Sequence, residues 1–382
     1  MPSRTVVERI EYEGEGDPAG RSAIRGGGGV RAWRIEEHGG LEVLELVRIP
    51  EPEAGPGEVR VRIEALALNH LDLWVRRGVR GHRFPLPLIP VSDGTGRVVE
   101  VGAGVRGVQV GDPVLIWPGV SCGRCRPCQS GKDMFCREYA ILGEARDGLG
   151  AEDVVLPASN LALRPKGMDP HIAAAFPLTY QTAWSMIVER ARVAPGERVL
   201  IRAAGSGVGV AALQIARLLG ARVAATAGSP GKCAKALEEG AEHAWNHEEE
   251  DIAAKVREWT AGEGVEVVVD HCGRETFGES LRCLGRGGRF VTCGATSGPE
   301  AEIHLGHVFY KSLSILGATM GSKGSLHRIA SLVADGALKP RLGKVLVGLE
   351  TLPEGHRLLE ERAVFGKVVI DLGEGSSSPE GD

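Results

Sequence analysis

Four cysteines occupy one short stretch of the sequence, in the order C-x2-C-x2-C-x7-C. They are Cys122, Cys125, Cys128 and Cys136. Thiolates this close together are typical of a metal site, and four of them supply every ligand of a tetrahedral Zn²⁺. Because no position is then left for water, such a metal is structural rather than catalytic. We predict one structural zinc per chain.

The cysteine spacing also leaves an iron–sulfur cluster and disulfide bonds as alternatives. A bacterial iron–sulfur pattern ends with three residues before a final Cys-Pro, whereas here seven residues precede Cys136 and Arg137 follows it. Disulfide bonds need an oxidising compartment, and the start of the chain has no apolar export signal. We therefore expect a cytoplasmic protein whose cysteines are reduced.

A glycine-rich loop is the second feature that could do chemistry. The run Gly205-Ser206-Gly207-Val208-Gly209 lies between a predicted strand, 199–201, and a predicted helix, 208–219. A further strand, 222–227, follows, and this order is typical of dinucleotide binding. Glycines let the backbone approach a pyrophosphate, and the free amides at the helix start stabilise its charge. The alternative is a tight turn that binds no ligand.

The residues after the next strand indicate which nicotinamide cofactor to expect. NAD is usually recognised by an acidic side chain about 20 residues beyond the glycine loop, and the segment 225–232 contains none. Ser229 can hydrogen-bond a phosphate, and Lys232 can neutralise one. We therefore expect NADP(H) in preference to NAD(H); the alternative is that Lys232 is an ordinary solvated lysine.

The composition and the element pattern restrict the fold. With 382 residues, 43% apolar and 25% charged, the chain is long enough for two or three globular domains. Its net charge of −5 argues against a nucleic-acid or anionic-membrane surface. No apolar run approaches the ~18 residues of a membrane span. Short alternating strands precede residue 160, and strands alternate with helices after 195, which predicts a parallel sheet covered on both faces.

These features together resemble the medium-chain dehydrogenase/reductases, which include zinc-type alcohol dehydrogenases and quinone oxidoreductases. The resemblance covers about residues 30–372. The motifs that carry it, besides the four cysteines, are Gly55-Pro-Gly-Glu-Val-Arg-Val61, Asn69-His-Leu-Asp72, Gly94-Thr-Gly-Arg-Val-Val-Glu-Val-Gly102, Leu178-Thr-Tyr-Gln-Thr-Ala-Trp184, Ala203-Ala-Gly-Ser-Gly-Val-Gly209 and Gly366-Lys-Val-Val369. It implies an α/β protein with a GroES-like β-rich catalytic domain and a doubly wound Rossmann domain.

The resemblance also implies the domain order. We expect a GroES-like catalytic domain over 30–163 with a zinc lobe at 121–137, and a Rossmann domain over 164–321. A return segment, 322–372, completes the catalytic domain. Residues 1–29 are interpreted as a disordered leader, with Val30 as a candidate true initiator, and 373–382 as a disordered tail.

Alcohol dehydrogenases of this family carry a second, catalytic zinc held by Cys, His and a further Cys or acid. The matching positions here are Asn69, Ser92 and Leu178. Leu cannot ligate a metal, and Asn and Ser are poor zinc ligands. The resemblance therefore favours an NAD(P)H-dependent oxidoreductase that transfers hydride to a quinone or an α,β-unsaturated carbonyl.

Two alternatives remain beside this function. The first is an alcohol or aldehyde dehydrogenase with a rearranged metal site that uses His70, Asp72 or Asp93. The second is a zinc-lobe protein that binds a partner without turnover. Counting the zinc ions distinguishes the first alternative from the preferred function, and cofactor titration tests the second.

Candidate site residues follow from the family motifs. Asn69 could bind the substrate oxygen or the nicotinamide, and Asp93 is a candidate proton relay or a turn residue. Asp72 matches a family Asp, and His70 a position that often approaches the pyrophosphate. Thr179 and Thr182 are candidates for the nicotinamide side, or for helix caps. We expect a small carbonyl or quinone substrate, no nucleic acid or membrane partner, and a homodimer or homotetramer.

Overall fold

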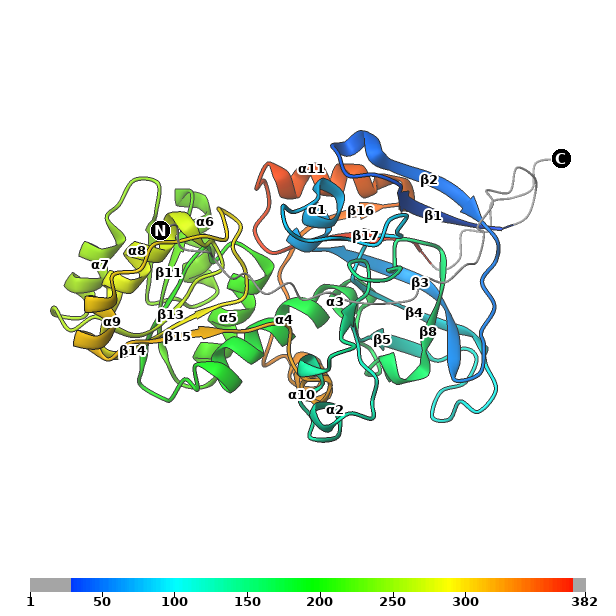
Figure 1. Cartoon of the computed structure of the whole chain (residues 1–382), viewed down its shortest axis with the longest axis horizontal. Coiled ribbons are helices and arrows are strands. Elements are labelled where there is room, and N and C mark those ends of the chain that lie inside the picture. Colours follow the sequence, from blue (N-terminus) through cyan, green and yellow to red (C-terminus); the bar gives the residue numbers. More distant parts are fainter. Residues whose placement is uncertain (1–28, 374–382) are drawn as a thin grey trace, which may run out of the picture.

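The computed structural model describes residues 29–373, which form a β-rich domain and a parallel-sheet domain side by side (Figure 1). The β-rich domain is built from both ends of this range, and the parallel-sheet domain lies between them in sequence. The predicted fold class is confirmed. The interpretations of residues 1–28 and 374–382 concern segments outside the described residues.

The main sheet of the β-rich domain is mixed, in the order β16-β17-β3-β4-β5-β9, with β8 paired to β3. Its strands are β3 (Glu58–Leu68), β4 (Asp93–Val101), β5 (Pro113–Ile116), β8 (Asp153–Pro157), β9 (Leu161–Leu163), β16 (Leu342–Val347) and β17 (Lys367–Asp371). Two smaller sheets pair β1 (Val30–Ile35) with β2 (Leu44–Ile49), and β6 (Gly119–Val120) with β7 (Ala140–Ile141). Because β17 pairs antiparallel with β3, the end of the chain completes this domain.

The second sheet consists of six parallel strands in the order β12-β11-β10-β13-β14-β15. They are β10 (Arg198–Ile201), β11 (Arg222–Ala227), β12 (His243–Asn246), β13 (Val265–Val269), β14 (Leu284–Thr292) and β15 (Ser314–Gly317). Val199 and Ile201 pack into one buried cluster and Leu200 into another, so both faces of the sheet are covered. The strand order reverses between β10 and β13, which is where such sheets open a crevice for ligands.

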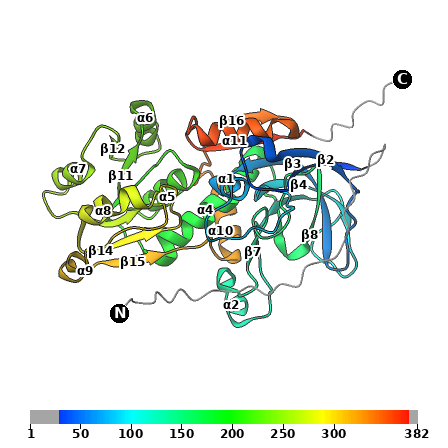
Figure 2. The same cartoon turned by 45° about the horizontal axis from the view of Figure 1, so that its top comes forward.

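Helices of the parallel-sheet domain cover its sheet, and others pack against the sheet of the β-rich domain (Figures 1 and 2). They are α1 (His70–Arg77), α2 (Arg126–Gln129), α3 (Pro170–Ala175), α4 (Pro177–Trp184), α5 (Gly207–Leu218), α6 (Pro230–Glu238), α7 (Ile252–Trp259), α8 (Arg274–Cys283), α9 (Leu305–Lys311), α10 (Lys323–Ala334) and α11 (Leu352–Glu360). Every residue of α4 is buried, because both domains pack against it. Within residues 29–373, no helix has the length and apolar character needed to cross a bilayer.

Candidate active site and metal centre

A buried polar cluster joins three distant segments where the two domains meet. The Lys367 ammonium donates to Asn69 Oδ1 at 2.5 Å and lies 3.1 Å from Asp93 Oδ2. Asn69 Nδ2 donates to the same Asp93 oxygen at 2.9 Å. All three residues are buried, and Asp93 is fully inaccessible. Because a buried charge is costly unless it is paired and hydrogen-bonded, these contacts hold the three segments together.

The second oxygen of Asp93 ties α4 to the same cluster. Asp93 Oδ1 accepts the backbone N–H of Leu178 at 2.9 Å, so both carboxylate oxygens of Asp93 are engaged. Lys367 retains one of its three N–H donors, and Asn69 retains one of its two amide hydrogens. The cluster can therefore stabilise negative charge in the cleft.

Asp72 and His70 lie beside this cluster in different settings. Asp72 Oδ2 accepts the Asn69 backbone N–H at 2.7 Å, as part of a capping box at the start of α1. Burial raises the pKa of Asp72 to about 7. His70 packs edge-on against Trp74, and desolvation followed by the nearby Arg77 lowers the pKa of His70 to about 4. The His70 imidazole is therefore neutral at pH 7, and Asp72 orients Asn69 through the backbone.

The two threonines of α4 donate their hydroxyl groups to backbone carbonyls four residues earlier in the chain. Thr179 Oγ1 donates to Ala175 O at 3.3 Å, and Thr182 Oγ1 donates to Leu178 O at 2.7 Å. The methyl group of Thr179 faces the glycine loop, where a Cβ on Gly207 would lie 2.9 Å from both Thr179 Cγ2 and Lys367 Cδ. Only glycine at position 207 therefore allows the loop, α4 and Lys367 to approach one another this closely.

The glycine loop begins α5 with a side-chain cap. Ser206 Oγ accepts the Gly209 N–H at 2.9 Å and lies 2.9 Å from His271 Nε2. Desolvation lowers the pKa of His271, so its ring is neutral and its Nδ1, which is buried, has no partner among residues 29–373. The amides at the start of α5 face the crevice at the strand ends, which is the arrangement that binds a pyrophosphate.

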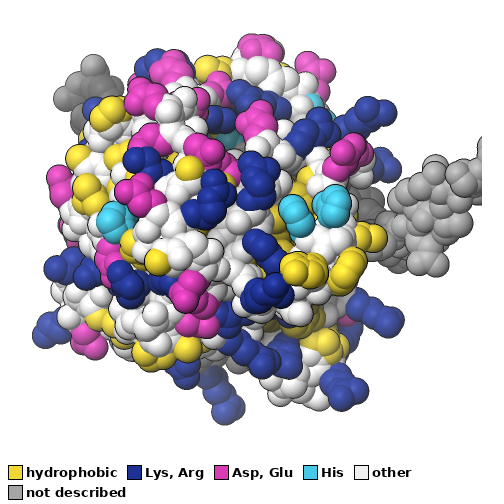
Figure 3. Space-filling model, turned by 90° about the vertical axis from the view of Figure 1, so that its left-hand side faces the viewer, with side chains coloured by type: hydrophobic (Ala, Val, Ile, Leu, Met, Phe, Trp, Pro, Cys, Tyr) yellow, Lys and Arg dark blue, Asp and Glu magenta, His cyan; other side chains and the backbone are white. Residues whose placement is uncertain are grey.

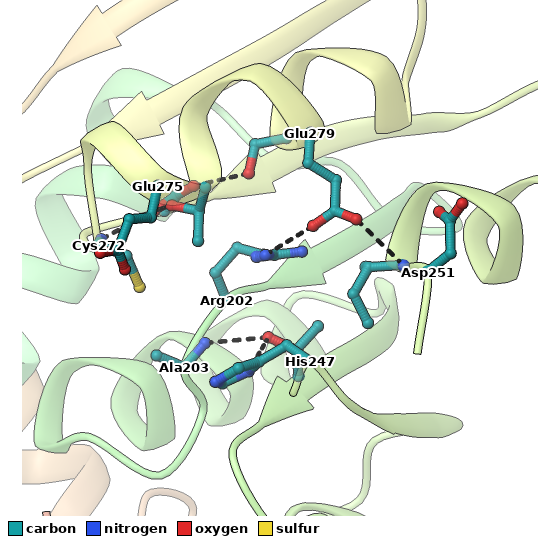
Figure 4. Close-up of polar contacts among 12 residues, drawn as sticks. Arg202, Ala203, His247, Asp251, Cys272, Glu275 and Glu279 are labelled. Atoms are coloured by element: carbon teal, nitrogen blue, oxygen red, sulfur yellow. Dashed lines mark hydrogen bonds and ion pairs between the residues drawn. The ribbon is translucent and has the colours of Figure 1, made fainter. Parts of the chain in front are cut away.

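A buried ion pair lies behind this loop (Figure 4). Arg202, at the end of β10, is 3% exposed, and its Nη2 lies 2.9 Å from Glu279 on α8. On the other side of Arg202, Thr226 Oγ1 accepts the Ala203 N–H at 3.2 Å and contacts His247 Nδ1 at 3.3 Å. These groups fix the ends of β10 and β11 on the side of the sheet that carries α7 and α8.

Ser229 and Lys232, which the sequence predicts to bind a 2′-phosphate, lie at the start of α6. Ser229 is its N-cap and accepts the Lys232 N–H at 3.4 Å. Lys232 Nζ donates to Arg362 O at 2.5 Å, which joins this helix to the return segment. β11 ends at Ala227 without an acid, but Glu248 Oε1, from the loop after β12, would lie 3.8 Å from a Cβ on Gly228.

The four cysteines come together as the spacing predicts. Their sulfur atoms all lie within 4.8 Å of one another. Across residues 29–373, no other group of three or more His, Cys, Asp or Glu side chains has this compactness, so His70, Asp72 and Asp93 do not form a second one. Four converging thiol groups fit a tetrahedral zinc, which would stabilise the loop that carries them.

Comparisons with known proteins agree with this architecture. The model of an alcohol dehydrogenase GroES-like domain matches residues 55–166, and that of a zinc-binding dehydrogenase matches residues 207–335. A quinone oxidoreductase of Salmonella typhimurium is 32% identical over 356 residues, covering 89% of this chain and 99% of the relative. The chain belongs to the medium-chain dehydrogenase/reductase superfamily. It is an NAD(P)-dependent oxidoreductase.

Further members of the medium-chain dehydrogenase/reductase superfamily differ in their named activities. An acryloyl-coenzyme A reductase of Sulfurisphaera tokodaii is 30% identical over 328 residues, covering 85% of this chain and 96% of that protein. A crystal structure of an NAD-dependent alcohol dehydrogenase is 52% identical, with a TM-score of 0.86, and covers 90% of this chain and 100% of that one. These relatives share the superfamily, and their names denote different substrates.

Sequence reasoning missed several residues that the fold brings to the cleft of this medium-chain dehydrogenase/reductase. They are Arg202, His247, His271 and Lys367. Arg202, His247 and His271 lie just after the ends of β10, β12 and β13, and Lys367 begins β17. Arg202 and Lys367 offered one usable signal, since a cation in a predicted buried strand needs a partner.

The cysteine cluster predicts one zinc ion per chain and a stability that depends on it. Changing Cys136 to Ser removes a buried ligand, so we expect loss of the metal and a lower melting temperature. Metal analysis by mass spectrometry and thermal unfolding measure both. Changing the buried Cys233, which lies outside the cluster, to Ser is the control. Two zinc ions in the wild-type protein would contradict the prediction.

The Lys367 cluster predicts a defect in coenzyme binding when the ammonium is removed. Lys367→Met loses a charge-assisted donor beside the glycine loop, and we expect coenzyme affinity to fall ~10-fold or more. Lys367→Arg restores the charge and should recover part of the affinity. Fluorescence titration measures the dissociation constant, with the exposed Lys344→Met as control. Wild-type affinity in a folded Lys367→Met protein would show that this cation does not serve the coenzyme.

Proposed function

We propose that this protein uses NADP(H) to reduce a quinone or an α,β-unsaturated carbonyl compound. The observation that carries the proposal is the Lys367–Asn69–Asp93 cluster, which engages Asn69, the position that the family resemblance matches to a ligand of the catalytic zinc. Of the three matching ligand positions, Leu178 has no donor atom in its side chain, and Asn69 already bonds Lys367 and Asp93. These residues do not fit a zinc site.

The chemistry of the cleft favours an electrophilic acceptor. Oxidising an unactivated alcohol requires removal of its hydroxyl proton, which a zinc ion makes easy by lowering the pKa of the bound oxygen. A quinone or an enone needs no such activation, because hydride adds to carbon and the resulting negative charge spreads onto the carbonyl oxygen. A proton from solvent or a side chain then completes the reduction. Fixed donors at that oxygen lower the barrier without a metal.

The residues of this chain have separate roles in the proposal. A bound nicotinamide coenzyme supplies the hydride. The amides that follow Ser206 bind its diphosphate, and Lys367 adds positive charge beside Gly207. The second amide hydrogen of Asn69, which does not bond Asp93, donates to the carbonyl oxygen of the acceptor. Leu178 and Met320, which belong to one buried apolar cluster, give the acceptor pocket an apolar wall.

The names of two relatives support this class of substrate. Quinone oxidoreductase and acryloyl-coenzyme A reductase both denote the reduction of an electron-poor acceptor. An alcohol dehydrogenase with a rearranged metal site finds less support, since Asp93 is engaged with Lys367 and Leu178 and Asp72 with Asn69. Alcohols therefore belong in a substrate panel as the competing class.

The coenzyme preference rests on the start of α6. No acid ends β11, Ser229 caps α6, and Lys232 lies one turn into it, so a 2′-phosphate has a donor and a cation. Glu248, whose Oε1 would lie 3.8 Å from a Cβ on Gly228, is a carboxylate that would instead favour the 2′-hydroxyl of NAD(H). Both coenzymes therefore belong in the test.

A substrate panel tests the proposal. Wild-type protein with a measured zinc content is assayed with quinones, enones and unsaturated thioesters against NADPH and NADH, and with primary and secondary alcohols against NADP⁺ and NAD⁺. We expect the highest kcat/KM for an electron-poor acceptor with NADPH, at one zinc per chain. Preferential oxidation of alcohols together with a second zinc would overturn the proposal in favour of the alcohol dehydrogenase alternative.

We also propose that the chain forms a homodimer, alone or within a homotetramer, through the β15 edge. β15 is the last strand of its sheet and pairs only with β14 among the described residues. The preceding α9 exposes Leu305, Phe309 and Tyr310 at 69%, 75% and 67%. Figure 3 shows apolar side chains gathered beside two histidines on this end of the molecule. A strand edge is self-complementary under two-fold symmetry, so a second copy fits it.

The predicted interface is tested by charge insertion. Phe309→Glu combined with Tyr310→Glu places two carboxylates in the apolar patch, and we expect a shift toward the monomer mass in light scattering. Val110→Glu, at a residue 63% exposed in the other domain, is the matched control. A double variant with the wild-type mass would place the interface elsewhere.

A further inference from the structure

The cysteine lobe, residues 121–137, contacts the return segment as well as its own domain. Asp133 lies in a short turn between Cys128 and Cys136 and is only 5% exposed. Its Oδ1 accepts the backbone N–H of Lys323, the first residue of α10, at 2.9 Å. Figures 1 and 2 both place α2 of the lobe next to α10. The lobe therefore meets a helix that lies 190 residues away in sequence.

This contact supplies a helix cap that α10 lacks locally. The residue at the N-cap position, Ser322, makes no side-chain cap, and its hydroxyl donates to Glu189 Oε1 at 3.4 Å instead. A carboxylate at the start of a helix satisfies a free amide and interacts favourably with the helix dipole. Asp133 performs this function from the lobe. Its second oxygen is buried without a hydrogen-bond partner within residues 29–373, so the helix start is its main contact.

The residues directly before α10 pack against α4 and against the apolar cluster that contains Leu178. Met320 is 5% exposed and belongs to the apolar cluster of Leu178 and Ile141. Its sulfur lies 3.9 Å from Thr182 Oγ1 on α4. Met320 has a φ of +48°, a conformation that is uncommon for a bulky residue and persists only when its surroundings fix it.

The next residue shows how closely this turn is packed. A Cβ on Gly321 would lie 2.6 Å from the Gln181 carbonyl oxygen of α4, so no larger residue fits without movement. The turn is thus held on one side by α4 and on the other by the Asp133–Lys323 bond. Two residues separate that bond from Met320.

We propose that Asp133 is a positioning residue through which the cysteine lobe sets the substrate pocket, by capping α10 and holding Met320 against α4. The inference rests on the proposed function, because it assigns the wall of that same acceptor site. The cysteine lobe, whose four thiolates fill every coordination position of a zinc ion, thereby affects substrate affinity. Coenzyme binding depends on the glycine loop and Lys367 and should be unaffected.

Paired variants of the full-length, zinc-loaded protein test this proposal. Asp133→Ala removes the cap, and we expect KM for the preferred acceptor to rise ~10-fold while kcat and the NADPH dissociation constant stay within ~2-fold. Asp133→Asn keeps an acceptor oxygen and should restore most of the substrate affinity. Glu138→Gln, which changes an exposed carboxylate directly after the lobe, is the matched control and should behave as wild type.

Hydrogen exchange gives a readout that needs no substrate. In Asp133→Ala we expect faster exchange of amides 323–326, with unchanged zinc content and unchanged exchange at the start of α5. If those amides exchange as in Glu138→Gln, or if Asp133→Ala loses zinc and NADPH affinity together, the positioning role is overturned. If the wild-type protein reduces no acceptor, the proposed function is contradicted instead. The hydrogen-exchange result then still decides whether Asp133 caps α10.

Discussion

One buried cation, together with the oxygen atoms that pair with it, joins distant segments of the β-rich domain to α4. Lys367 is the first residue of β17, and it is 4% exposed. Left unpaired there, its charge would cost several kcal/mol. Asn69 from the start of α1 and Asp93 from β4 supply the partners, while Asp93 also holds the first turn of α4. The start of β17 is therefore held against α1 and β4, beside the glycine loop.

This constraint has chemical consequences. A lysine ammonium held by two side-chain oxygens is a fixed positive charge in a dry site, and it needs no reorganisation when negative charge develops nearby. Zinc would supply similar charge together with a bound oxygen of lowered pKa. Among the described residues the four cysteines form a compact thiol group, while Asn69 already bonds Lys367 and Asp93. The residues suited to a structural metal are therefore separate from the Lys367 cluster.

The spacing of apolar residues predicted a helix or strand well where that element has an apolar face of its own to bury. The strand expected over 222–227 became β11 (Arg222–Ala227), and the helix expected over 208–219 became α5 (Gly207–Leu218). The glycine loop was predictable for the same reason, because strand, loop and helix are consecutive. Lys367 and His271 were not, since a single polar residue beside an apolar run carries no information about which distant groups it meets. Asp133 looked like one of several charged residues between cysteines, and its role as the cap of α10 was invisible locally.

The sequence by itself determined the metal-ligand set and the nucleotide-binding loop, because each is encoded within a short run whose residues must be neighbours in any fold. Only the tertiary structure decided which side chains meet in the cleft. Lys367 and Asn69 are 298 residues apart, and Lys323 and Asp133 are 190 apart. Contacts over such separations follow from the pairing of β17 with β3 and the packing of α10 on α4. That packing is a property of the whole buried core rather than of any one motif.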